Sequence, residues 1–239
     1  MKVLVSPTSL EEARKVAQGG VDIIDIKNTN EGSLGANFPW VIQEIVSRLS
    51  HYEVLFSATI GDLPYKPGTA ALAALGATSV GARYVKAGLH TVETVDQAVD
   101  IMQAVKRACG MVSSSTIVVA SGYADYRRFN GIDPESIVMA ASRSGSDVVM
   151  LDTAIKDGRS LFDNMGFDEI KSFVDLGHRH ELTVALAGSV GVKHLKDLHL
   201  CGVDIIGVRG AVCDKSDRTQ GIDVDKVREF MRTVREITE

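Results

Sequence analysis

The chain has 239 residues, 45% of them hydrophobic, which suffices for one large domain or two small ones with a substantial core. Its formal net charge of −5 argues against nucleic acid as the main partner, because a phosphate backbone requires a basic face. The sequence shows neither a signal peptide nor an apolar run near the roughly 18 residues that cross a bilayer, so we expect a cytoplasmic protein without membrane contact. Three cysteines lack metal-ligand spacing, and neither a metal site nor a cofactor is predicted: Cys109, Cys201 and Cys213.

Short β-branched runs alternate with longer amphipathic stretches along the whole chain. Helical periodicity fills the intervals, as at Val41, Ile45 and Leu49. Eight βα units in this length predict a single-domain α/β protein, a (β/α)8 TIM barrel spanning residues 1–239. A doubly wound open sheet is the alternative, although the first βα turn, VSPTSL, lacks the glycine-rich dinucleotide fingerprint. The expected strands are residues 2–6, 22–27, 53–59, 83–88, 116–121, 147–153, 182–188 and 204–210.

A weak internal repeat aligns four of these strands: GVDIIDIK (20–27), GARYVKAG (81–88), GSDVVMLD (145–152) and GVDIIGVR (202–209). Alternate residues of a strand point to opposite faces, so each strand has two parities. One parity should face the barrel interior, and it becomes polar toward the C-terminal end of each strand. The other parity is apolar throughout and should face the helices: Ile24, Ile26, Val85, Ala87, Val149, Leu151, Ile206 and Val208.

The inward parity brings charged residues together at the mouth of the barrel, where enzymes of this fold keep their active sites. Asp25 and Lys86 should share one interior layer, and Lys27 and Asp152 the next layer outward. Lys156 follows Asp152 closely enough to reach over the same mouth. Two residues in these layers have no side chain and leave room for a ligand: Gly88 and Gly207.

These five charged residues suggest amine chemistry. Burial and mutual repulsion both lower the pKa of a lysine, and the neutral amine is the nucleophile that forms a Schiff base with a carbonyl. The two carboxylates would balance the remaining charge and transfer protons. The alternative is a structural ion-pair network that fills the top of the barrel.

The segments AGSVGV (187–192) and GVRGAV (207–212) end the last two strands, where barrels frequently bind phosphate through backbone N–H groups and a helix N-terminus. Alternatively, glycine turns occur here only because βα loops need positive φ. The predicted phosphate-binding residues are Gly188, Ser189, Gly207, Arg209 and Gly210.

Two loops, NTNEGSLGANFP after the second strand and GDLPYKPG after the third, are long enough to act as lids or to be ordinary surface loops. Asn37, Asp62 and Lys66 are their candidate ligand contacts. Phe38 and Trp40 begin the second helix and are expected to pack. Five histidines are expected to be solvated: His51, His178, His180, His194 and His199. His90, just past the fourth strand, is the exception that lies near the mouth.

Six segments together resemble the (5-formylfuran-3-yl)methyl phosphate synthase family: DIIDIKN…EGSLGANFPWVI, SATIGDLPYKPGT, VASGYADYRR, DVVMLDTAIKDG, ALAGSV and DIIGVRGAVC. The resemblance covers nearly the whole chain. It implies a class I aldolase-like barrel that joins two molecules of glyceraldehyde 3-phosphate into a phosphorylated furan aldehyde, with loss of one phosphate and two waters. It also implies that Lys27 forms the Schiff base, that Lys86 transfers protons, and that Asp25, Asp152 and Lys156 take part.

Two other functions compete with this hypothesis. The first is a different Schiff-base or phosphosugar barrel, such as an ordinary aldolase or isomerase. The second is a non-catalytic sensor that binds triose phosphate without turnover. Barrels of this kind often assemble through their outer helices, so a homo-oligomer is compatible with the sequence, which reserves no recognisable apolar stripe for it.

Overall fold

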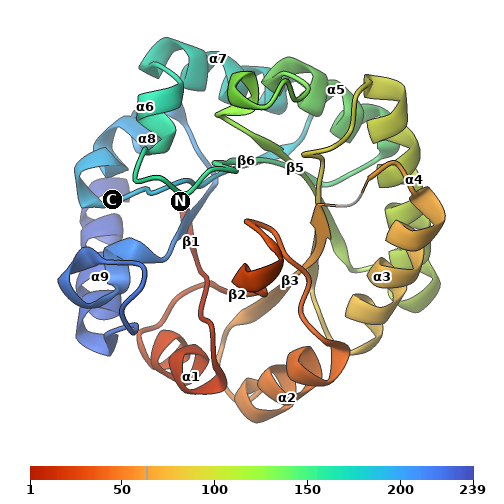
Figure 1. The fold of residues 1–239 in the computed structure, drawn as a ribbon. Coiled ribbons are helices and arrows are strands. Elements are labelled where there is room, and N and C mark those ends of the chain that lie inside the picture. The colour runs from red at the N-terminus through yellow and green to blue at the C-terminus, as the bar shows by residue number, and fades with distance from the viewer. Residues whose placement is uncertain (63) are drawn as a thin grey trace.

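A computed structural model describes residues 1–62 and 64–239, and in it eight parallel strands form a closed barrel (Figure 1). Each strand pairs with the next, and β8 pairs with β1, so the sheet has no edge. The predicted TIM barrel is therefore confirmed, and the open-sheet alternative is wrong. The strands are β1 (Lys2–Val5), β2 (Ile23–Ile26), β3 (Leu55–Asp62), β4 (Tyr84–Gly88), β5 (Ile117–Tyr123), β6 (Val148–Asp152), β7 (Thr183–Leu186) and β8 (Ile205–Val208).

Helices surround the barrel on all sides in Figure 1. Several begin with a side-chain cap: Ser9, Thr94 and Asp133 each accept a hydrogen bond from a backbone N–H of the first turn. In the part of the chain that the structure describes, no helix is long and apolar enough to cross a membrane. The helices are α1 (Leu10–Gln18), α2 (Pro39–Leu49), α3 (Pro67–Ser79), α4 (Val95–Val112), α5 (Pro134–Ser144), α6 (Leu161–Asn164), α7 (Phe167–Arg179), α8 (Leu195–Cys201) and α9 (Val224–Thr238).

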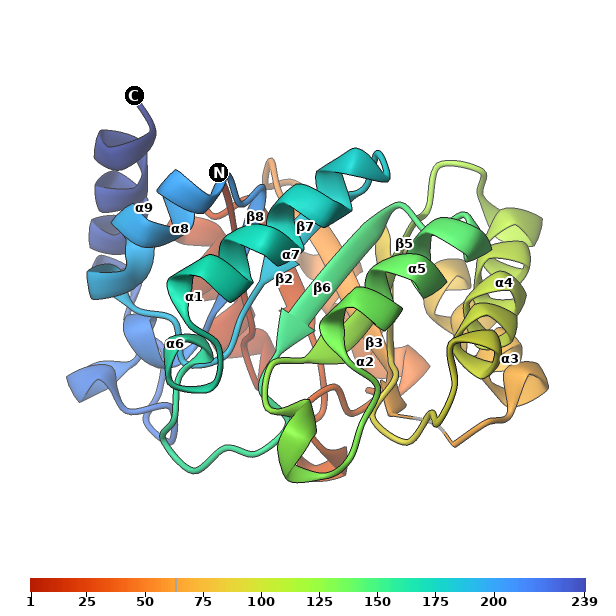
Figure 2. The same cartoon turned by 90° about the horizontal axis from the view of Figure 1, so that it is seen from above.

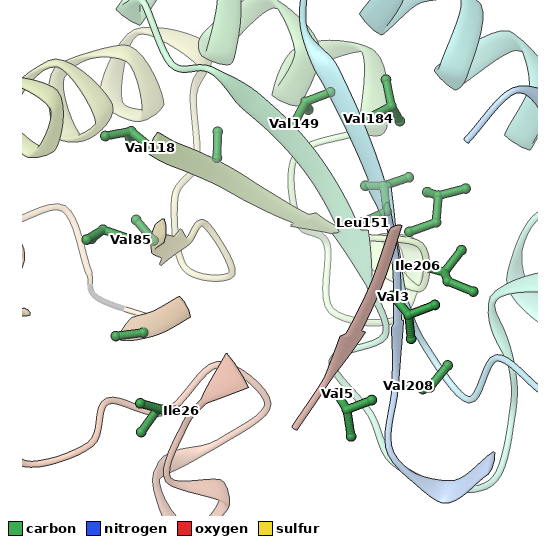
Figure 3. Packing of buried hydrophobic residues seen from close by; sticks show 14 of the residues in the cluster. Val3, Val5, Ile26, Val85, Val118, Val149, Leu151, Val184, Ile206 and Val208 are labelled. Atoms are coloured by element: carbon green, nitrogen blue, oxygen red, sulfur yellow. The ribbon is translucent and has the colours of Figure 1, made fainter. Parts of the chain in front are cut away.

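Two apolar clusters divide the core. The larger one lies between strands and helices and contains the whole outward parity predicted from the repeat, as Figure 3 shows for Val85, Val149 and Ile206. The smaller cluster fills the barrel with inward residues such as Ile23, Tyr84 and Met150. The predicted alternation of the strands is therefore confirmed.

The loops that follow the strands gather at one end of the barrel, and the two chain termini lie at the other end (Figure 2). β3 runs on to Asp62, beyond its predicted end at Thr59. Gly61 adopts a φ of 99°, and the register shifts between Thr59 and Asp62, which then pairs with Gly88. Such a bulge changes the direction of the end of the strand. Asp62, which was predicted to lie in the loop, is therefore the last residue of β3. Leu63, in the same predicted loop, lies outside the described residues.

The packing role predicted for Phe38 and Trp40 is wrong. Both side chains stack on each other, with ring centroids 4.8 Å apart, and they remain 49% and 65% exposed at the start of α2. The face of α2 that packs on the barrel starts one turn later with Ile42 and Ile45.

A buried ion pair ties the end of β8 to α1. The guanidinium of Arg209 donates to both carboxylate oxygens of Glu12, at 2.8 and 3.2 Å. Glu12 also accepts from the backbone N–H of Thr8 and of Ile222. Burial opposes the charge on Glu12, but Arg209 and these donors outweigh it and lower the pKa of Glu12 to about 2.

We expect Glu12→Gln to lower the free energy of unfolding by about 2 kcal/mol at pH 7, because it removes charge-assisted hydrogen bonds. The folded-state pKa lies below the ordinary value, so this stabilisation is present above pH 4.5 and is lost as the pH falls toward 2. Urea titrations of the wild type and of Glu12→Gln at pH 7, 5 and 3 measure this difference in the free energy of unfolding. Glu11→Gln, at a carboxylate 81% exposed, is the matched control. A constant difference between Glu12→Gln and the wild type at all three values would contradict the assignment.

Candidate active site

An ion pair inside the barrel forms the base of the site. Lys86 on β4 places its Nζ 2.6 Å from Oδ1 of Asp25 on β2, and the two side chains are 2% and 1% exposed. Apart from this ion pair, neither atom has a hydrogen-bond partner among the described residues. The other oxygen of Asp25 accepts from the hydroxyl of Ser6 at 2.9 Å and lies 3.9 Å from Nζ of Lys27. The predicted proximity of Asp25 and Lys86 is confirmed.

Burial governs the protonation of this group. It disfavours the ammonium of Lys86 and lowers the pKa of that lysine, and the neighbouring charge of Lys27 acts in the same direction while Asp25 opposes it. Burial alone would raise the pKa of Asp25, but Lys86 and Lys27 outweigh it and hold that pKa below its ordinary value. The site therefore combines a fixed carboxylate with a lysine whose ammonium form is weakened.

A second ion pair lies at the end of β6. Nζ of Lys156 is 2.8 Å from Oδ1 of Asp152 and 3.2 Å from the hydroxyl of Thr153. Burial works against the charge on Asp152, but Lys156 and Lys27 outweigh it and bring its pKa to about 2. Burial lowers the pKa of Lys156, and Lys27 adds to this effect. Lys156 lies in the loop before α6, and this loop carries it back over the strand end as predicted.

These groups adjoin a cavity of about 680 Å³ at the mouth of the barrel. Lys27, Asp152 and Lys156 line it together with the loops after β7 and β8. Lys27 is 11% exposed there, whereas Lys86 and Asp25 lie deeper and are not part of the lining that the structure describes. The volume suits a small metabolite, since ligand pockets span roughly 300–1,000 Å³.

The loop after β7 has the backbone of an anion site. Gly188 has a φ of 106°, and a Cβ there would lie 2.8 Å from the side chain of Thr153. Ser189 has a φ of 49°, a left-handed conformation that side chains rarely adopt and that clusters at functional sites. A short 3₁₀ turn, Val192–His194, follows this loop and precedes α8. The predicted phosphate-binding residues all line the cavity: Gly188, Ser189, Gly207, Arg209 and Gly210.

The guanidinium of Arg209 is already occupied. Besides Glu12, it donates to the backbone carbonyls of Ser6, Arg218 and Gln220. The geometry therefore disfavours the predicted direct contact of Arg209 with phosphate and makes it the residue that holds the loop after β8. That loop brings Arg218 to the cavity, a residue that sequence reasoning missed because it lies six positions beyond the glycine-bearing motif GVRGAV (207–212).

A further titratable group lies at the same end of the barrel. The hydroxyl of Tyr123, at the end of β5, donates to Oδ1 of Asp62 at 2.5 Å. The ring of His90 stacks on Phe129 at 4.0 Å and meets Tyr123 edge-on. Burial raises the pKa of Asp62, while Tyr123 and His90 oppose the shift. Tyr123 was missed by sequence reasoning, although its alternation with Ser121 and Val119 on a strand places it inward.

Other predicted contacts lie elsewhere. The amide of Asn37 donates to the backbone carbonyl of Lys27 at 3.4 Å. Lys66 is exposed at the N-cap position of α3, and its side chain makes no capping hydrogen bond. The prediction that His194 is solvated is wrong, because it is 8% exposed and stacks on Phe162 at 4.9 Å. Among the described residues, no group of three or more His, Cys, Asp or Glu side chains is arranged to hold a metal ion.

Fold and site together define a TIM barrel with paired lysines and carboxylates at its mouth. A profile of the 4-HFC-P synthase family matches residues 3–231. The chain belongs to this family, and it is an enzyme.

Relatives in archaea extend the match. The chain is 51% identical over 231 residues to the (5-formylfuran-3-yl)methyl phosphate synthase of Methanothermobacter thermautotrophicus, covering 96% of this chain and 97% of that one. It is 50% identical over 234 residues to the synthase of the same name from Archaeoglobus fulgidus, covering 98% and 99%. The family resemblance stated from the motifs is thereby confirmed.

Solved structures with the same fold are more distant. The 3-hexulose-6-phosphate synthase from Salmonella typhimurium superposes with a TM-score of 0.67 at 21% identity, covering 99% of this chain and 100% of that one. KGPDC from Streptococcus mutans superposes with a TM-score of 0.67 at 13% identity, covering 100% and 99%. At these identities the likeness shows the fold alone.

We expect Arg218→Ala to weaken binding of inorganic phosphate about tenfold, the loss of one charge-assisted contact to an anion. Calorimetric titration measures the affinity, and the thermal midpoint should hardly change because Arg218 is half-exposed. Arg209→Ala is the contrasting variant, since it should lower the thermal midpoint by releasing Glu12. Unchanged affinity in Arg218→Ala would remove this residue from the site.

Proposed function

We propose that the chain condenses two molecules of glyceraldehyde 3-phosphate into (5-formylfuran-3-yl)methyl phosphate, with loss of one phosphate and two waters, as a step of methanofuran biosynthesis. Membership of the 4-HFC-P synthase family and the names of relatives that are about half identical support the product. A carbon–oxygen lyase of this kind would work in the cytoplasm, where phosphorylated trioses are retained by their charge.

The assignment of the nucleophile depends on one observation, the reach of Lys27 into the cavity. Lys86 is buried below the cavity and pairs closely with Asp25. Lys156 lines the cavity, but its amine already contacts Asp152 and Thr153. Lys27 lines the cavity with its nearest ion-pair partner 3.9 Å away. Of the three amines, that of Lys27 is therefore the most available to a carbonyl, and we assign it to the Schiff base.

Lys86 and Asp25 support that amine from below. Uptake of one proton from solvent and loss of water from the carbinolamine leave a cationic imine on Lys27, and the ionised Asp25 stabilises this charge. Lys86, whose ammonium is weakened by burial, can release a proton toward Asp25 and take one back. We infer that Lys86 acts through Asp25, because it does not line the cavity.

Asp152 and Lys156 act on the other side of the same carbonyl. Removal of the proton next to the imine carbon by a carboxylate gives an enamine, and the C–H electron pair becomes the C=C bond of that enamine. The enamine carbon then bonds to the aldehyde carbon of the second triose phosphate, whose oxygen takes a proton from the ammonium of Lys156. Loss of phosphate, ring closure and dehydration complete the furan, and its aromaticity favours the product. Addition of water to the imine then releases the aldehyde and regenerates the amine of Lys27.

Phosphate binding orients the substrates. The loop Gly188–Ser189 and the backbone of Gly210 line the cavity at the end where backbone N–H groups of such barrels hold phosphate. Arg218, Lys156 and Lys27 bring positive charge to the same cavity, although the whole chain carries a net charge of −5. This local charge attracts a dianionic substrate to an acidic protein.

We expect borohydride with glyceraldehyde 3-phosphate to reduce an imine on Lys27 and to leave a triose-sized adduct on its peptide, which mass spectrometry detects. Lys27→Ala and Lys27→Arg should lose the adduct and at least about a thousandfold of the turnover rate with the fold intact, because covalent catalysis needs this amine. An adduct on Lys86 alone would exchange the roles of the two lysines, with Lys86 as the nucleophile and Lys27 as the supporting residue. Near-normal turnover in Lys27→Ala would reject the mechanism.

The product separates the proposal from its competitors. A furan synthase releases inorganic phosphate and forms a conjugated aldehyde with strong ultraviolet absorbance. An ordinary aldolase or isomerase would convert the triose phosphate without either signal, and a sensor would bind it without turnover.

A further inference from the structure

Leu34 is a buried leucine outside the hydrophobic core. It is 0% exposed, although it lies in the loop between β2 and α2. Among the described residues it belongs to neither of the two apolar clusters. Burial of this leucine removes apolar surface from water and thereby stabilises the loop in its position.

The surroundings of Leu34 are the inner wall of the barrel mouth. A Cβ built on Gly88 would lie 3.2 Å from Cδ1 of Leu34 and 1.9 Å from Oδ1 of Asp62. Gly88 follows Lys86 by two residues on β4, so both positions face the barrel interior and Gly88 lies one layer nearer the mouth. The space directly above Lys86 is therefore occupied by the carboxylate of Asp62 and, beside it, by the side chain of Leu34.

Hydrogen bonds hold the loop in this place. The hydroxyl of Thr59, which pairs with Lys86 in the sheet, donates to the carbonyl of Gly35 at 2.6 Å. The hydroxyl of Ser33 donates to the carbonyl of Thr153 at the end of β6, at 3.0 Å. These contacts come from strands on different sides of the barrel, and in Figure 1 the loop (red-orange) projects over the barrel centre. The loop also starts directly after Lys27.

We propose that Leu34 closes the barrel mouth above Lys86 and thereby determines the size of substrate that the site accepts. The cavity remains open on the side of β6 to β8, where Asp152, Gly188 and Gly210 line it, and Leu34 closes the side of β3 and β4. A longer sugar phosphate would need the space that the leucine fills. The inference deepens the proposed function, because it rests on a short aldose phosphate as the substrate.

The same position explains why Lys86 lies outside the cavity. Its side chain is 2% exposed, with Asp25 beside it and the loop above it. Water exclusion by an apolar side chain keeps the amine in a medium that disfavours its charge. Leu34 is thus a specificity-determining residue for the substrate and a positioning residue for the Lys86–Asp25 pair.

Lysine labelling tests the closure without reference to catalysis. The wild type and Leu34→Ala are reductively methylated with formaldehyde, and peptide mass spectrometry compares the rate at Lys86 with that at Lys27. We expect the ratio to rise about fivefold or more in Leu34→Ala, because the local barrier to solvent is removed. Leu89→Ala is the matched control, since this leucine is 1% exposed but belongs to the outer core. An unchanged ratio in Leu34→Ala would overturn the proposal, as would an equal rise in Leu89→Ala.

Substrate competition tests the specificity. We expect Leu34→Ala to reduce the discrimination in kcat/KM between glyceraldehyde 3-phosphate and an aldotetrose phosphate by about tenfold. This is the lower end of the effect that one methylene group in a hydrophobic pocket has on discrimination between substrates. Leu34→Met, which retains the volume, should keep the wild-type preference. If wild-type protein forms the furan and Leu34→Ala discriminates as the wild type does, the inference on Leu34 fails and the function stands. If wild-type protein forms no furan, the function fails, and labelling still decides the closure.

Discussion

The Asp25–Lys86 ion pair is the constraint on which the rest of the site depends. Two opposite charges within the barrel lose their hydration, and such a pair survives only when each compensates the other. Lys86 lies 2.6 Å from Asp25, and Lys27 supplies a second positive charge at 3.9 Å. One carboxylate cannot neutralise both ammonium groups, so an excess of positive charge remains within the group. This excess adds to the effect of burial in lowering the pKa of Lys86, and it favours the binding of an anion.

Strand geometry converts this constraint into an active site. Asp25 and Lys27 are two residues apart on β2, so they share the inward face and differ in height by one layer. The lower residue is sealed in the barrel, and the upper one reaches the cavity. One strand end thus provides both the buried carboxylate and the accessible amine. Lys156 and Asp152 repeat the pairing at β6 with the lysine coming from a loop instead of a neighbouring strand.

The sequence allowed the barrel and its inner ring of charges to be predicted, because both depend on the period of two along the strands. The ion pair of Asp25 with Lys86 and the apolar outer parity followed from this alignment alone. Features of the loops did not follow. The bulge at Gly61, which moves Asp62 into the barrel, depends on pairing with Gly88. The burial of Leu34 depends on contacts with segments 25 to 119 positions away in the chain, beyond any local pattern.

Arg209 shows how such distant contacts change the meaning of a motif. An arginine after a glycine-bearing strand end is typical of a phosphate ligand, yet here its donors are used by Glu12 and by backbone carbonyls on both sides of the cavity. A guanidinium with its donors satisfied cannot also hold a phosphate without losing those bonds. Its contribution is to fix the loop after β8, which presents Arg218 to the cavity. Positive charge at the site is thereby supplied by a residue that no motif indicates and that the buried Glu12–Arg209 pair holds in place.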